Sequence, residues 1–159
     1  MGGNLGFMRW LFLTLAICFG VTASAAAAEG HVFKVLPQFL DQQGREALTP
    51  SLYDRDAYQA HLRQNPTNIS TLRFAVQWKV SYPKSDARKL RVEVRGAEKQ
   101  GLPSQTVLEL PLTEKHAFSH WDYVVFDKDK YKAFGEVTAW RVTLWDGDQL
   151  LDEQKSFLW

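Results

Sequence analysis

The stretch LWDGDQLLDE, at positions 144–153, holds four acidic residues within ten positions and is a candidate metal-ion loop. A calcium loop needs oxygen ligands at alternating positions of a longer segment, and Leu150 and Leu151 stand where such a loop requires an acid or a glycine. Asp-Gly between two alternating apolar runs is a strong signal for a tight β-hairpin, because its turn needs the positive φ that Gly147 adopts freely. The stretch therefore predicts a hairpin turn and no ion site.

His116 and His120 are a second candidate pair of metal ligands, since residues four apart on a helix face the same ion. They precede a segment with strand character, where residues four apart lie about 13 Å from each other, so we expect no shared zinc. The sequence also lacks a nucleophile elbow, a glycine-rich phosphate loop and a paired metal-ligand motif. We expect no catalytic residue, no metal and no cofactor.

Tryptophans are concentrated near the C-terminus, with Trp121, Trp140, Trp145 and Trp159 all in the last 40 residues. Large aromatic side chains fit the interior of β-sandwiches, so we expect most of these rings in the core. Exposed rings also serve as stacking platforms for sugars. Trp145 and Trp159 are the two residues that we nominate as possible ligand-stacking positions.

Basic residues outnumber acidic ones by seven to three between positions 79 and 99. Such a stretch could meet an anionic glycan or a phosphate. An exposed strand face, balanced by acidic residues from elsewhere in the chain, explains it more simply.

The first 28 residues have the pattern of a Sec-type signal peptide, with Arg9, then a 12-residue run at 10–21 that is apolar apart from Thr14, then the small residues TASAAAA. The apolar run is shorter than the roughly 20 residues that a membrane-spanning helix needs. We expect cleavage after Ala28, or else after Ala25. A lipoprotein anchored through Cys18 is the alternative, which the bulky Ile17 before it and the longer small-residue region after it disfavour.

Removing 28 of the 159 residues leaves 131, which is a single domain by length. Arg9 is the only charged residue lost, so 18 basic and 18 acidic residues remain and the net charge is zero. This excludes a global field for attracting nucleic acid. Cys18 is the only cysteine, so the exported chain would hold no disulfide, which suits a protein of the bacterial periplasm or a secreted bacterial protein. We expect no nucleic-acid partner and no stable membrane insertion after cleavage.

Beyond residue 30, apolar and polar residues alternate with the period of two that is typical of half-buried strands. Leu72, Phe74, Val76 and Trp78 share one face of the clearest example. Pro37 lacks the N–H that a central strand donates, so we expect the first strand at a sheet edge. The charged residues 127–130 are expected to form a solvated connection. Seven strands are predicted, at 31–40, 72–82, 89–95, 105–112, 121–126, 137–145 and 149–159.

Residues 52–64 break the alternation and predict a helix. Ser51 followed by Asp54 resembles a capping box, and Pro66 restricts the residue before it to extended backbone. We expect this helix to pack across one open end of the strand layers. The residues expected on its buried face are Tyr53, Ala57, Tyr58, His61 and Leu62.

Seven short strands in residues 29–159 predict an all-β protein, a single β-sandwich with one short helix before the second strand. FAVQWKVSYPKSDARKLRVEVRG resembles the B-to-C region of a fibronectin type III domain, with Trp78 at the position of its core tryptophan. TAWRVTLWDGDQLLDEQKSF resembles the F-to-G hairpin, with Trp140 where that family usually has tyrosine. The resemblance covers residues 72–158 and implies an immunoglobulin-like sandwich, a fold that hosts binding and spacer roles.

These observations together predict an exported, non-catalytic protein that acts as a protein-interaction or structural module of the bacterial cell envelope. Its expected partner is an envelope protein or a glycan. A carbohydrate-binding module that uses exposed aromatic residues is the second hypothesis, and an unrecognised hydrolase is the third.

Overall fold

The computed structural model describes residues 29–81, 87–98, 101–112 and 118–159. The predicted signal peptide and His116 lie outside these ranges. The described elements are β1 (Gly30–Asp41), α1 (Leu52–Gln64), the 3-10 turn η1 (Pro66–Asn68), β2 (Ile69–Val80), β3 (Arg88–Ala97), β4 (Pro103–Pro111), β5 (His120–Val125), α2 (Lys128–Phe134), β6 (Glu136–Asp146) and β7 (Gln149–Lys155).

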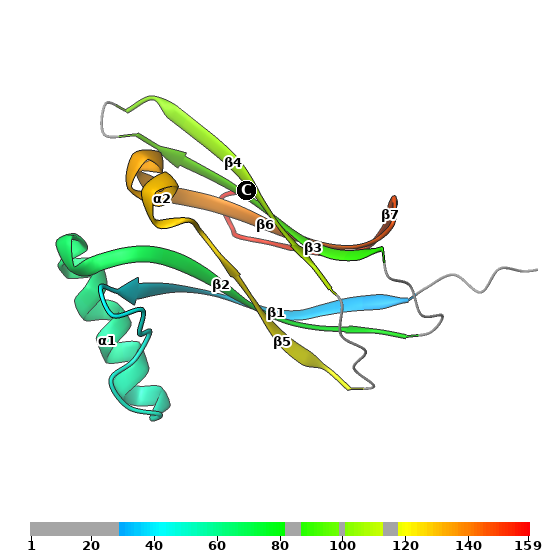
Figure 1. Ribbon diagram of the computed structural model, residues 1–159, viewed down its shortest axis with the longest axis horizontal. Helices are drawn as coiled ribbons and strands as arrows, with labels where there is room; N and C mark the ends of the chain where they lie inside the picture. Colours follow the sequence, from blue (N-terminus) through cyan, green and yellow to red (C-terminus); the bar gives the residue numbers. More distant parts are fainter. Residues whose placement is uncertain (1–28, 82–86, 99–100, 113–117) are drawn as a thin grey trace, which may run out of the picture.

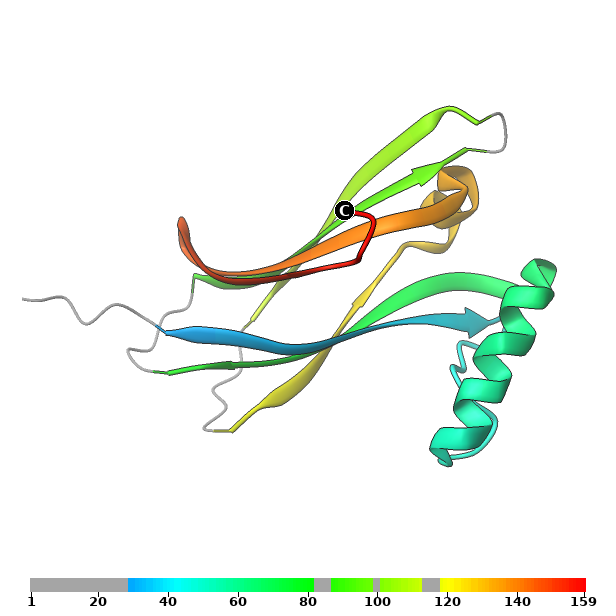
Figure 2. The ribbon, with the colours of Figure 1, turned by 180° about the vertical axis from the view of Figure 1, so that it is seen from behind.

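The strands form two antiparallel sheets that stack as layers, so the prediction of an all-β sandwich is confirmed (Figures 1 and 2). One sheet has three strands in the order β1-β2-β5, and the other has four in the order β4-β3-β6-β7. All seven predicted strands are present. β1 lies at the edge of its sheet, as the proline in its centre predicts.

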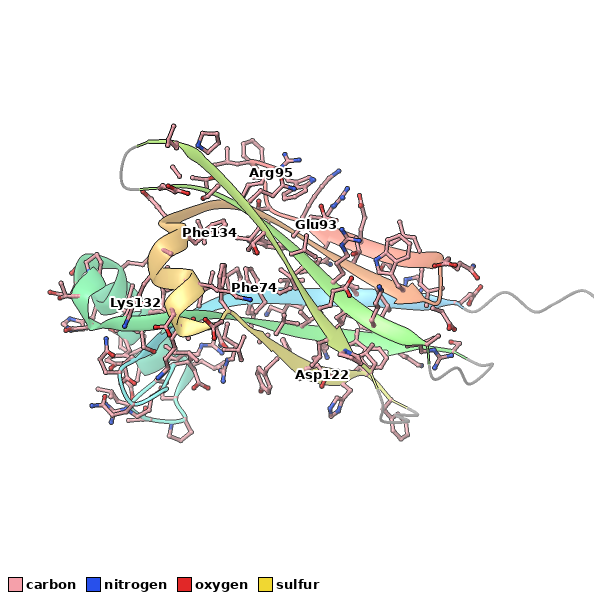
Figure 3. All side chains as sticks on the ribbon, turned by 45° about the horizontal axis from the view of Figure 1, so that its top comes forward. Phe74, Glu93, Arg95, Asp122, Lys132 and Phe134 are labelled. Atoms are coloured by element: carbon pink, nitrogen blue, oxygen red, sulfur yellow. The ribbon has the colours of Figure 1, made fainter. Side chains whose placement is uncertain are left out.

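The core lies between the two layers and is built from the alternating apolar residues of both. Trp78 is only 4% exposed, and Phe74 meets Trp140 of the opposite sheet edge-to-face, with 6.2 Å between ring centroids. Phe74 points between the layers (Figure 3). The predicted apolar face of β2 is therefore confirmed, since Leu72, Phe74, Val76, Trp78 and Val80 are all in this core.

α1 has the predicted bounds and N-cap, because the Ser51 side chain accepts a hydrogen bond from the Asp54 N–H. Its predicted position across the open end is wrong, and its predicted buried face is confirmed for Leu62 but wrong for Tyr53, Ala57 and His61, which are exposed. The helix lies against the end of β1, beside the three-stranded sheet, and buries Gln59 and Leu62, whereas Tyr53 is exposed (Figure 1). Its rotation is set by polar bonds: Gln59 accepts from the Phe39 N–H (2.8 Å) and donates to the Phe39 carbonyl (2.9 Å).

The predicted charged connection at 127–130 is the start of the second helix, α2. Asp127 caps it by accepting hydrogen bonds from the N–H groups of Asp129 and Lys130. Phe134 at its end is buried, with its ring 5.3 Å from that of Phe126. α2 therefore closes the open end of the sandwich that the sequence pattern assigned to α1 (Figure 2). Its seven residues are too few to show helical periodicity in the sequence.

The β6–β7 hairpin is confirmed, with Asp146 paired to Gln149 and Gly147 at φ +57°. Its two turn residues are Gly147 and Asp148, one position later than Asp-Gly itself would place them. The prediction that the last strand continues to Trp159 is wrong. β7 ends at Lys155; the Ser156 N–H still donates to the Trp140 carbonyl opposite it, and the chain then turns, with the Trp159 N–H donating to the Ser156 carbonyl.

Candidate binding site

The outward-facing side of the four-stranded sheet carries most of the charged and aromatic candidates, and we call it the charged face. The register aligns Glu93 with Val107 on one side and Arg141 on the other, and aligns Arg91 with Glu109 and Thr143. β7 adds Glu153 and Lys155 beside β6. The charged face comprises Gln105, Val107, Glu109, Lys89, Arg91, Glu93, Arg95, Ala139, Arg141, Thr143, Trp145, Glu153, Lys155 and Trp159.

Glu93 is the centre of an ion-pair network on this face. Glu93 is 9% exposed, and its carboxylate accepts two hydrogen bonds from Arg141 Nη2, at 3.0 and 2.9 Å, while Arg91 Nε lies 3.4 Å away. Lys89 pairs with Glu109 at 3.1 Å in the same way. The expectation that acidic residues from elsewhere balance the basic stretch is confirmed for Lys89, which pairs with Glu109, and for Arg88, which pairs with Asp146. Charge-assisted bonds of this kind fix the arginine side chains in one arrangement.

Trp159 folds back onto this face after β7 ends. Its ring centroid is 3.9 Å from Arg95 Cζ and 5.0 Å from Arg141 Cζ, so two guanidinium groups contact the ring as cation–π partners. Arg95 and Glu93 project from the side of the sheet opposite to Phe74 (Figure 3). The ring, the two arginines and Glu93 therefore form one continuous cluster.

Trp145, the other nominated stacking residue, lies on the same face about 13 Å along β6 from Arg141. Its Nε1 donates to Thr143 Oγ1 at 2.8 Å, which holds the half-buried ring against the sheet. Trp121 is half-buried on the outer side of the other sheet, beside Gln77. The expectation that most of these C-terminal rings lie in the core is wrong, because only Trp140 packs against it.

Asp41 is a buried carboxylate away from the charged face. Burial acts to raise its pKa, but hydrogen bonds from the Arg45 N–H, the Tyr58 hydroxyl and the Arg45 guanidinium outweigh burial and lower the pKa to about 2. The bond to Asp41 in turn raises the pKa of Tyr58. The group joins the loop after β1 to α1, so its role is structural.

In the three-stranded sheet, Asp122 of β5 binds Trp78, the core tryptophan of the neighbouring strand β2. Trp78 Nε1 donates to Asp122 Oδ2 at 2.7 Å, and His120 Nε2 lies 4.0 Å from the other oxygen. The sequence-based expectation that His116 and His120 share no zinc stays a prediction, because His116 lies outside the described ranges. Within those ranges, no three His, Cys, Asp or Glu residues are grouped as metal ligands.

Two open pockets lie at opposite ends of the sandwich. One of about 460 Å³ lies between β4 and α2 and is lined by polar groups including Glu98, Ser104 and Lys130. The other, of about 220 Å³, lies between the start of β1 and the β6–β7 hairpin. Ser104 Oγ in the larger pocket donates to the Phe134 carbonyl, so this hydroxyl supports the end of α2.

Comparison of the chain with models of known protein families, with curated proteins and with solved structures finds no match. Among the described helices, none is both long and apolar enough to cross a membrane.

The sequence pattern indicated Trp145 and Trp159 but not Arg95 and Arg141, which contact the Trp159 ring, nor Glu93, which binds Arg141. The available signal was the alternation of charged with apolar residues along 89–95, which indicates one polar face. Glu93 and Arg141 are 48 positions apart, so only strand pairing brings them together.

Proposed function

We propose that this protein is an exported, non-catalytic binding module of the bacterial cell envelope that uses the charged face to bind a protein partner. The observation that carries the proposal is the cluster of Trp159 with Arg95 and Arg141. Tryptophan and arginine are the residue types most enriched among the energetic centres of protein interfaces. The ion pair with Glu93 holds Arg141 in place before binding, and the cation–π contacts hold Arg95 and the Trp159 ring together, which lowers the entropic cost of association.

We also propose that the sandwich is of the immunoglobulin-like type, as the resemblance to fibronectin type III domains implies. The strand order supports this, because sheets β1-β2-β5 and β4-β3-β6-β7 correspond to strands A-B-E and C′-C-F-G of that fold. In this assignment β2 and β3 are strands B and C, and β6 and β7 are strands F and G.

The direction of the pKa shifts supports a non-catalytic role. General acid–base catalysis near neutral pH requires groups whose pKa moves toward neutrality. Among the described residues, the clear shifts lower the pKa of Asp41 and raise those of Arg45, Tyr58 and Tyr131, so every one moves away from neutrality. Burial is the main cause at Tyr131, with Glu136 second.

Carbohydrate binding is the second candidate, because Trp145 and Trp159 lie on the same face. Arg95 and Arg141 lie under the Trp159 ring, so the side of the ring that they contact is not open to a sugar, and only the opposite side remains for stacking. A protein partner would instead contact the residues around the cluster and leave the contacts of Trp159 with Arg95 and Arg141 in place. The arrangement of the cluster therefore favours a protein partner over a sugar.

Site-specific photo-crosslinking in living cells tests the proposal. A photoreactive amino acid at Lys155, whose side chain is 55% exposed on the charged face, is expected to capture a defined envelope protein. The same group at Val125, 51% exposed on the outer side of the other sheet, serves as the matched control and is expected not to. Trp159→Ala is expected to abolish the Lys155 crosslink, whereas Trp121→Ala is expected to leave it.

Capture of the same protein from both positions would contradict the assignment of the charged face. Titration with envelope polysaccharides distinguishes the second candidate, because a saturable change in tryptophan fluorescence that is lost in both Trp145→Ala and Trp159→Ala would establish sugar binding. Hydrolytic turnover that persists through purification and disappears with His120→Ala would support the hydrolase instead.

A further inference from the structure

β4 is a sheet edge whose outer side has no hydrogen-bond partner in the described parts of the chain. The strand runs nine residues beside β3 with no break in register. The edge of β1 is different, because side chains cover it: Asp152 accepts from the Val32 N–H at 2.8 Å, and Gln59 binds both backbone groups of Phe39. A long, uncovered edge is a template for pairing with another strand.

The direction of the free backbone groups follows from the two ends of the β3–β4 ladder. The Leu112 N–H donates to the Arg88 carbonyl, and the Glu98 N–H donates to the Leu102 carbonyl. In an antiparallel ladder, directly opposite residues alternate between hydrogen-bonded and non-bonded pairs. The even-numbered residues of β4 therefore bind β3, and the odd-numbered ones, from Pro103 to Pro111, direct their backbone groups away from the sheet.

The outward positions are arranged symmetrically about Val107. Proline, which has no N–H, occupies the first and last of them, Pro103 and Pro111. Between the prolines, Gln105, Val107 and Glu109 each offer one outward N–H and one outward carbonyl. The side chains of these three residues all belong to the charged face.

We propose that two copies of this chain pair through β4, antiparallel, about a twofold axis at Val107. In this register Val107 faces Val107 of the second copy, and Gln105 faces Glu109. Each outward N–H of Gln105, Val107 and Glu109 then meets a carbonyl of one of these three residues, and the prolines, which have no donor, fall opposite each other at the two ends. Shifting the register by two residues in either direction places a proline opposite Gln105 or Glu109 and leaves the carbonyl of that residue without a donor.

Side-chain chemistry fits the same register. Val107 is 41% exposed, so the pairing buries apolar surface at the centre of the contact. Glu109 is the only charged residue of the strand, and it faces an uncharged amide that can donate to it. Lysine on an edge strand and like charges opposite each other are two common means of preventing edge pairing. The β4 edge has no lysine, and the proposed register places no like charges opposite each other.

This pairing joins the two four-stranded sheets into one continuous sheet of eight strands. The axis is perpendicular to the sheet, so both charged faces lie on the same side. The dimer would present two Trp159 clusters to a partner. The inference therefore extends the proposed function, in which a single charged face binds the partner, because two linked clusters bind with added avidity.

Sedimentation of the purified exported protein over a range of concentrations tests the inference. The wild type is expected to show a monomer–dimer equilibrium. Val107→Pro removes one outward N–H at a position equivalent to Pro103 and Pro111, so the fold is expected to remain and the dimer to be lost. The matched control is Val125→Pro at the edge of β5: the Phe126 N–H donates to Leu72, so Val125 also points outward, and dimerisation is expected to persist.

A charge exchange tests the register. Gln105→Glu places two pairs of like charges across the twofold axis and is expected to weaken the dimer about tenfold. Adding Glu109→Gln restores the complementary pairs with the positions exchanged, so the double variant is expected to dimerise like the wild type. A double variant that stays as weak as Gln105→Glu would overturn the register.

Disulfide trapping gives a third measurement, in a Cys18→Ser background. Hydrogen-bonded residues in antiparallel strands have Cα atoms about 5.5 Å apart, within the range of a disulfide, so Val107→Cys is expected to form a linked dimer and Val125→Cys is not. A wild-type protein that stays monomeric up to about 1 mM, or whose Val107→Cys variant links only to a different polypeptide, would overturn self-pairing.

Discussion

Glu93 and Arg141 show at the scale of single residues how a surface becomes fixed. The Glu93 carboxylate is almost fully covered, so it is stable only while Arg141 supplies two hydrogen bonds to it. A buried charge that loses its partner costs far more than an exposed one. The same bonds position Arg141 under Trp159.

Arg141→Met is therefore expected to lower the free energy of unfolding by about 2 kcal/mol or more, because it leaves the Glu93 carboxylate without its main partner. Adding Glu93→Leu is expected to recover most of that loss, since an apolar residue removes the buried charge. Chemical denaturation measures both effects. Lys155→Met, at an exposed ion pair on the same face, is the control and is expected to change stability by less than about 0.5 kcal/mol.

Asp41 gives a prediction of pH dependence. Its pKa in the folded protein, about 2, is below the ordinary value of 3.8 for an aspartate, so the charged carboxylate stabilises the fold above about pH 4. That contribution is lost as the pH falls from about 4 through 2. Asp41→Asn is expected to cost about 1–3 kcal/mol at pH 7, and its difference from the wild type is expected to shrink at pH 2.5.

Denaturation at several pH values checks this, with Asp148→Asn in the exposed hairpin turn as the control. A constant difference between Asp41→Asn and the wild type across that pH range would show that the carboxylate charge is not responsible.

At the scale of elements, one amide side chain makes two of the hydrogen bonds that attach α1 to β1, beside the bond from Tyr58 to Asp41. Gln59 forms hydrogen bonds with both the N–H and the carbonyl of Phe39 at the edge of β1, as the backbone of a neighbouring strand would. Gln59→Leu keeps a similar volume but leaves a backbone N–H and carbonyl without partners. We expect a loss of about 1–3 kcal/mol and faster hydrogen exchange at the Phe39 N–H. Gln64→Leu on the exposed side of the same helix is expected to leave both unchanged, and equal exchange in the two variants would show that α1 is held by other contacts.

Two glycines at element junctions are expected to differ in their tolerance of substitution. Gly147 has φ +57° but a Cβ there would have only Ala87 nearby, at 4.0 Å, so Gly147→Val is expected to cost about 1 kcal/mol from backbone strain. Gly135, at φ +87°, connects α2 to β6 and packs its backbone against the Ala97 carbonyl. Gly135→Ala is expected to cost more than Gly147→Val, because a clash adds to the strain; thermal melting of both variants compares them.

For the whole molecule, the export proposal predicts the mass of the protein recovered from its host. The expected chain begins at Glu29 and carries no lipid, because a signal peptidase cleaves after small residues such as Ala28. Intact-mass measurement tests both statements. A diacylated Cys18 at the N-terminus would place the protein on a membrane surface instead.

Local patterns in the sequence predicted much of the fold. Alternation along 72–80 predicted the buried face of β2, because side chains of a strand point to opposite sides and only one side meets the core. Ser51 and Pro66 set the ends of α1, and Gly147 predicted the hairpin. Each of these features depends on residues that are neighbours in the chain.

Tertiary structure decided what depends on residues far apart in the chain. The strand order of the two sheets, the rotation of α1, the position of α2 at the open end and the fold-back of Trp159 all depend on contacts between separate elements. The charged face shows the reason most clearly: the sequence marks residues 89–95 as a strand with one polar side, but pairing with β6 determines that Glu93 meets Arg141 and that Trp159 covers Arg95. Burial and charge pairing are properties of the assembled sheet, so no local pattern can specify them.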